Sequence, residues 1–91
     1  MPVHMWWSIG DVAHGGQRVS DVTAAVAALD QSVHRIEGWP GKPAELQGLA
    51  ADADAMVTRM LDEGRQALEE GRSWSARVGA VVMELSRFHP E

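Results

Sequence analysis

Four histidines are the first side chains in this 91-residue sequence that could do chemistry: His4, His14, His34 and His89. No two of them share the i, i+4 spacing with which a helix presents a pair of metal ligands. The sequence contains no cysteine, so disulfides and thiolate metal sites are excluded. We therefore expect surface histidines, no metal site and no cofactor.

Acidic residues occur in close pairs that point to different faces of a helix: Asp52 with Asp54, Asp62 with Glu63, and Glu69 with Glu70. General acid–base catalysis needs carboxylates that converge in a pocket, where burial tunes their pKa values. Ser73-Trp74-Ser75 has no histidine nearby, and Gly15-Gly16 is too short for a phosphate loop. The sequence therefore indicates no enzyme.

The formal net charge is −5, and residues 44–70 carry most of the acidic excess. An acidic surface repels phosphate, so we expect no nucleic-acid partner. No apolar run is long enough to span a bilayer. The sequence starts without a basic region followed by a long apolar stretch, which argues against a Sec-type signal peptide.

Among the secondary-structure elements that the sequence predicts, the clearest is a helix over residues 17–37. Apolar residues there alternate at steps of three and four: Val19, Val22, Val26, Leu29, Val33 and Ile36. This heptad pattern is typical of an amphipathic helix. Ser20 or Asp21 could cap it, and Asp11 could start it earlier.

A turn is expected over residues 38–43, at Gly38, Trp39, Pro40 and Gly41. Gly38 is suited to a left-handed helix stop. Trp39 precedes a proline and is therefore biased away from the helical region. The chain should reverse direction here.

A second helix is expected over residues 44–88. Its apolar face comprises Leu46, Leu49, Ala53, Val57, Leu61, Gly64, Leu68, Gly71, Ser75, Val78, Val82 and Leu85. Gly71-Arg72-Ser73 could kink this helix near 71–73 or divide it into two. Two long helices joined by a short loop predict an all-α antiparallel hairpin in one domain spanning 1–91. The unpaired length of the second helix should be covered by segment 1–16 or by a partner.

Segment 1–16 is interpreted as an apolar N-terminal arm. Its cluster of Met5, Trp6, Trp7 and Ile9 fits a lid over the hairpin and equally a protein-binding anchor, since tryptophan is enriched in interface hot spots. Trp74 is a further candidate partner-binding residue, at a kink or in the core.

Residues Trp39-Pro40-Gly41 between two helical patterns resemble the Trp-x-Gly (WXG, early-secreted-antigen-like) family of small type VII (ESX) secretion substrates. The resemblance implies a helical hairpin that dimerises with itself or a similar hairpin as a four-helix bundle. It also implies export by a dedicated membrane ATPase. The family's C-terminal export signal contains a tyrosine; this sequence has none, and Phe88 with Glu91 match it imperfectly.

We therefore expect a non-catalytic protein–protein interaction module that resembles a type VII secretion substrate or partner. A phage or virion structural adaptor, head–tail or capsid-associated, is one alternative. A small intracellular helical regulator of the antitoxin kind is another. Export by a non-Sec route follows only if the resemblance holds; otherwise the cytoplasm or a virion is expected.

Overall fold

The structure is a computed structural model, and it describes residues 2–41 and 44–87 apart from the side chain of residue 45. Four strands are present: β1 (Val3–Ile9), β2 (Ala13–Val19), β3 (Trp74–Val78) and β4 (Val81–Arg87). The segment between β2 and β3 is helical: α1 (Val22–Glu37), the 3₁₀ turn η1 (Ala44–Leu46), α2 (Leu49–Arg59), the π-helical turn η2 (Met60–Gly64) and α3 (Arg65–Glu69).

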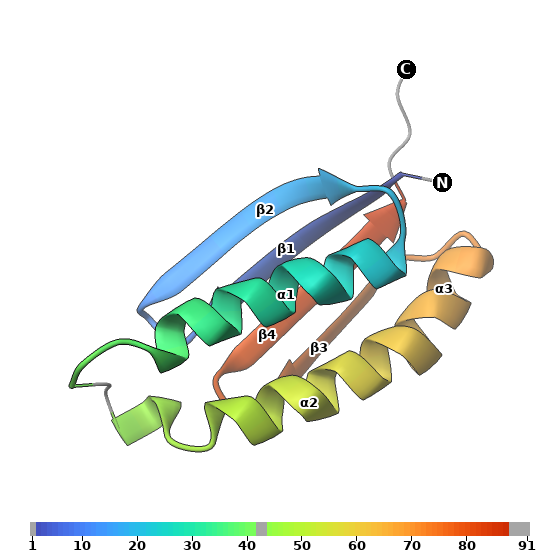
Figure 1. Cartoon of the computed structure of the whole chain (residues 1–91). Coiled ribbons are helices and arrows are strands. Elements are labelled where there is room, and N and C mark those ends of the chain that lie inside the picture. The colour runs from blue at the N-terminus through green and yellow to red at the C-terminus, as the bar shows by residue number, and fades with distance from the viewer. Residues whose placement is uncertain (1, 42–43, 88–91) are drawn as a thin grey trace.

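The strands form one antiparallel sheet in the order β2-β1-β4-β3. Helix α1 and the continuous helix formed by α2, η2 and α3 both pack on one face of it (Figure 1). None of the described helices covers the other face. We call that second surface the open face; it carries the outward side chains of the four strands.

The prediction of an all-α helical hairpin completing a four-helix bundle is wrong, because the chain folds as α+β. Segment 1–16 is not an arm; it forms β1 and most of β2. The second helix does not run over 44–88, because its last helical residue is Glu69 and residues 74–87 form the β3–β4 hairpin. The residues that were to be covered by a partner helix are therefore already paired in the sheet.

Strand β1 follows from the alternation of buried and outward side chains along Val3–Ile9. Val3, Met5 and Ile9 point into the core and are buried, whereas His4 and Trp6 point to the open face and are exposed. Period-two alternation of this kind is the pattern of a half-buried strand. The paired segment of β2 contains Gly15 and Gly16, which are weak strand formers and need help from their neighbours.

The help comes from two tryptophans of β1. Trp7 lies opposite Gly15 and Trp6 lies opposite Gly16 in the register. A Cβ on Gly15 would lie only 3.1 Å from Cζ2 of Trp7, so the indole occupies the space above that glycine. An aromatic ring laid over a cross-strand glycine restores the packing that the glycine lacks.

The β3–β4 hairpin closes through the two-residue loop Gly79-Ala80, between the paired Val78 and Val81. Gly79 has φ +57°, the left-handed conformation that glycine adopts readily at the first central position of a type II′ hairpin turn. Gly10, in the β1–β2 turn, donates its backbone N–H to the Ala80 carbonyl at 2.8 Å. The two hairpin turns are therefore joined at one end of the sheet.

Helix α1 begins at Val22 and not at residue 17 as predicted, because residues 17–19, Val19 included, pair with β1 as part of β2. Asp21 caps it, because its carboxylate accepts a hydrogen bond from the Ala24 N–H at 2.8 Å. It ends at Glu37, but Gly38 has φ −82° rather than the expected left-handed conformation, which occurs at Gly41 instead. Its stripe of Val22, Ala25, Leu29, Val33 and Ile36 is buried against the sheet and α2.

The second helical segment packs closely on the β3–β4 hairpin. Gly64, in η2, is buried, and a Cβ there would lie 3.2 Å from Trp74 Cε3 and 3.3 Å from Leu85 Cδ1. The glycine thus lets the helix approach the sheet. The core between the layers is made of apolar side chains: Met5, Ile9, Leu29, Leu46, Leu49, Met56, Met60, Val81, Met83 and Leu85 are all nearly or fully buried.

Candidate functional site

The proposed N-terminal binding cluster separates into core residues and one exposed residue. Met5 and Ile9 have no exposed surface, so they are core side chains and cannot contact a partner. Trp7 is half-buried, packed against the core and over Gly15. Only Trp6 stays available, with 36% of its surface exposed on the open face.

Trp74 is half-buried between the sheet and the helix layer. Its ring packs over Gly64, and the Arg59 guanidinium carbon lies 5.9 Å from the ring centroid, within cation–π range. Arg59 also forms an ion pair with Glu63 at 3.1 Å. Hydrogen bonding to Arg59 is the main cause that lowers the pKa of the Glu63 carboxyl. These contacts make Trp74 a residue of the layer interface.

The turn residues Gly38, Trp39, Pro40 and Gly41 lie between α1 and η1 and are all exposed. Trp39 is 40% exposed, about as much as Trp6. The predicted similarity of Phe88 and Glu91 to an export signal lies outside the described residues.

The open face consists of three rows of outward side chains that run across the strands. One row holds Arg18, His4 and Ser86; the middle row holds Gly16, Trp6, Glu84 and Ser75; the third holds His14, Ser8, Val82 and Arg77. All of these residues are exposed or half-buried. Trp6 is the one large ring in these three rows, and it sits in the middle row on a central strand.

A hollow of about 470 Å³ lies on this face beside Trp6. His4, Trp6, Ser75, Glu84 and Ser86 line it, together with residues of the adjoining edge. Glu84 is exposed, and in the described part of the chain its carboxylate has neither a hydrogen-bond donor nor an ion-pair partner. The hollow therefore joins an exposed aromatic face to an unpaired negative charge.

Sequence reasoning missed Glu84, His4 and Ser75 as members of one site. The alternation of residues 3–9 and 81–87 contained the necessary pattern, because outward positions of paired strands gather on one face. The prediction of a helix over residues 44–88 placed Glu84 on a helix rather than on the sheet face that carries His4 and Ser75.

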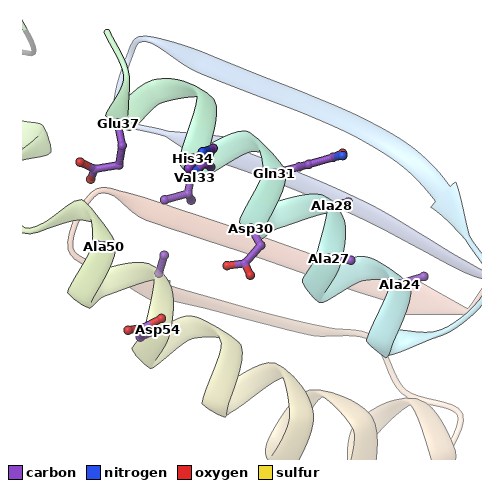
Figure 2. Close-up of a pocket in the computed structure, with 11 residues that line it drawn as sticks. Ala24, Ala27, Ala28, Asp30, Gln31, Val33, His34, Glu37, Ala50 and Asp54 are labelled. Atoms are coloured by element: carbon purple, nitrogen blue, oxygen red, sulfur yellow. The ribbon is translucent and has the colours of Figure 1, made fainter. Parts of the chain in front are cut away.

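A second concavity lies between α1 and α2, on the side away from the sheet (Figure 2). Its walls carry small side chains, among them Ala24, Ala27 and Ala50, and Asp30 and Asp54 project from the two helices toward the space between them (Figure 2). The groove offers no large aromatic or aliphatic side chain as an anchor. We therefore rank the open face above it as a binding surface.

A metal site and a membrane-spanning helix were also looked for among the described residues. In residues 2–41 and 44–87, no three histidine or carboxylate side chains are grouped so that they could hold a metal ion. The described helices include none whose length and hydropathy would let it cross a membrane. The described core also contains no buried polar or charged side chain.

Comparison with family models, with curated proteins and with solved structures finds no match to this chain. The resemblance to the Trp-x-Gly family thus has only its three residues behind it. The helical hairpin which that resemblance implies is not formed.

Proposed function

We propose that this chain is a non-catalytic protein-binding module whose binding surface is the open face of the sheet, with Trp6 as its anchor. The observation that carries the proposal is the exposure of Trp6 in the middle row of a sheet face that none of the described helices covers. Tryptophan contributes large, rigid contact area and is enriched among interface hot spots. The apolar composition of the described core supports binding rather than catalysis, since catalytic groups are usually tuned by burial.

The dimensions of the open face indicate the kind of complex. Four strands spaced about 4.8 Å apart and strands of about 23 Å give a flat area of about 450 Å². Stable complexes bury about 800 Å² of accessible surface per partner. The accessible surface of the open face is larger than this flat projection but still belongs to a small interface, so one anchor residue should supply much of the affinity.

The charges of the chain and of the open face indicate the partner. The whole chain has a net charge of −5, which repels the phosphates of nucleic acids. The open face itself carries Arg18 and Arg77 besides Glu84, so the partner we propose is a protein whose contact surface has both signs of charge, with its basic group at Glu84. The adaptor and regulator roles expected from the sequence are both roles of a protein-binding module, and they differ only in the partner that is bound.

Cross-linking from two faces tests the proposal. A photoreactive amino acid is placed at Ser8 on the open face and, as the matched control, at exposed Ala27 on α1. In the producing cell, Ser8 should cross-link one protein, identified by mass spectrometry, that Ala27 does not. The same protein captured only from Ala27 would contradict the proposal.

Affinity measurements with the purified partner then test the anchor. Trp6→Ala should weaken binding about 30-fold, the equivalent of about 2 kcal/mol. Trp39→Ala removes an equally exposed tryptophan from the turn and should change binding less than about twofold. Equal affinity of the wild type and Trp6→Ala would refute the proposed function.

A further inference from the structure

We infer that the hollow beside Trp6 receives an arginine side chain of the partner, stacked on Trp6 and paired with Glu84. This inference deepens the proposed function and rests on it.

The sheet register places the two groups side by side. Trp6 and Glu84 are directly opposite on the central strands β1 and β4, and their side chains share the open face. Opposite residues on one face have Cβ atoms about 4.5–5.5 Å apart. One planar cation can therefore touch the indole face and the carboxylate at the same time.

Both groups favour a cation. An indole face is electronegative and attracts ammonium and guanidinium groups. A carboxylate only accepts hydrogen bonds, and Glu84 has no donor or ion-pair partner in the described part of the chain. Ser75, opposite Glu84 on β3, and Ser86, two residues beyond it, add hydroxyl acceptors to the same hollow.

The neighbouring arginines do not occupy this position. Arg77 is directed toward the β3–β4 turn, where its Nε donates to the Gly79 carbonyl at 3.5 Å. Arg18 lies on β2, two strands from β4, which corresponds to about 10 Å. Neither arginine fills the hollow, and of the side chains that line it only His4 could itself carry a positive charge, so a guanidinium in this position would come from another molecule.

A guanidinium suits the pair better than an ammonium. It is planar, stacks on aromatic faces, and presents a rigid fork of donors that matches a carboxylate. An ammonium is more strongly hydrated and acts as a point charge. A partner arginine can thus satisfy Trp6 and Glu84 together.

A titration with small probes isolates this chemistry from the identity of the partner. The ¹⁵N-labelled full chain is titrated with Nα-acetyl-arginine amide and with Nα-acetyl-citrulline amide, which has nearly the same shape but no charge. The arginine probe should shift the Trp6 indole N–H and the Glu84 amide resonances, with saturation in the millimolar range. The citrulline probe should bind at least tenfold more weakly.

Two variants decide which site the probe occupies. Glu84→Gln should weaken the arginine probe about tenfold, whereas Asp54→Asn, on the rim of the interhelical groove, should leave its affinity unchanged. Equal binding of the two probes, wild-type affinity of Glu84→Gln, or shifts confined to the groove would each overturn the inference.

The partner distinguishes the failure of this inference from that of the proposed function. If Trp6→Ala weakens the complex and Glu84→Gln does not, the open face binds the partner without an arginine in the hollow. If neither variant weakens the complex, the proposed function itself fails.

Discussion

Replacing Gly64 by alanine perturbs the contact between the helix layer and the β3–β4 hairpin. Gly64 has ordinary helical dihedral angles, φ −64° and ψ −48°, so an alanine fits the backbone. In a solvent-exposed helix this change stabilises by about 1 kcal/mol. Here the new Cβ would lie 3.2 Å from Trp74 Cε3 and 3.3 Å from Leu85 Cδ1.

The steric cost should exceed the helix-propensity gain. Leu85 is 1% exposed and belongs to the core, so Leu85, Trp74 or the helix must shift to admit the new Cβ. Overpacking of this kind costs about 1–3 kcal/mol. We therefore expect Gly64→Ala to destabilise the fold by about 1 kcal/mol, which lowers Tm by about 4–8 °C in a domain of this size.

Urea unfolding followed by circular dichroism measures the change, and two further variants interpret it. Gly38→Ala also has helical angles, but its nearest neighbour is the Arg35 carbonyl at 3.6 Å, so it should be neutral or slightly stabilising. In a Trp74→Leu background, Gly64→Ala should lose part of its penalty, because the Trp74 ring is gone while Leu85 still crowds the Cβ. If Gly64→Ala stabilises as much as Gly38→Ala, the close packing of helix on hairpin is refuted.

Two other predictions concern burial and charge. Leu29→Ala should destabilise the fold by about 2–5 kcal/mol, because Leu29 has no exposed surface. Leu61 is 37% exposed, so Leu61→Ala should change the stability by no more than about 0.5 kcal/mol. Equal effects of the two variants in urea unfolding would contradict the assignment of the core. Hydrogen bonding and charge attraction from Arg59 lower the pKa of Glu63 in the folded state, so its stabilisation is complete above the ordinary value of 4.5 and is lost as the pH falls through the lower folded value. The Tm difference between wild type and Glu63→Gln should therefore be greatest near neutral pH, disappear in acid, and shrink in 1 M salt because the pair is exposed. A difference that grows on acidification would contradict this sign.

Helix α1 could be predicted from the sequence because its pattern has one interpretation. Valines, leucine and isoleucine recur at steps of three and four from Val22 to Ile36, a spacing that no strand produces. Only Val19, the first member of the pattern, lies in β2 instead. Asp21 and Glu37 are the cap and last residue of the helix in the structure. The turn at 38–41 could be placed for the same reason, since a helix precedes it and prolines and glycines follow.

The β3–β4 hairpin was missed because its apolar residues satisfy two periods. Trp74, Val78 and Leu85 fit the helical spacing, and Val78, Val81, Met83 and Leu85 also fit two alternating strands. The two patterns differ at Gly79, whose positive φ forms the tight turn between the strands. A single glycine inside a helical pattern does not by itself indicate such a turn.

Strand β2 could not be found from local preference. His14-Gly15-Gly16-Gln17 is poor in residues that favour strands. The strand is supported chiefly by Trp7, whose ring lies over Gly15 across the register, and this is a tertiary effect. The open face escaped prediction for the same reason, since it depends on which strands pair.

The most direct test of the open face as the binding surface is a cross-saturation NMR experiment on the complex with the cross-linked partner. With the partner unlabelled and irradiated, signal loss should be greatest at the backbone amides of His4, Trp6 and Glu84 and at the Trp6 indole N–H. Resonances of α1 and α2, including Ala27 and Asp54, should keep their intensity. Signal loss concentrated on the two helices, with the strands unaffected, would contradict the proposed binding surface.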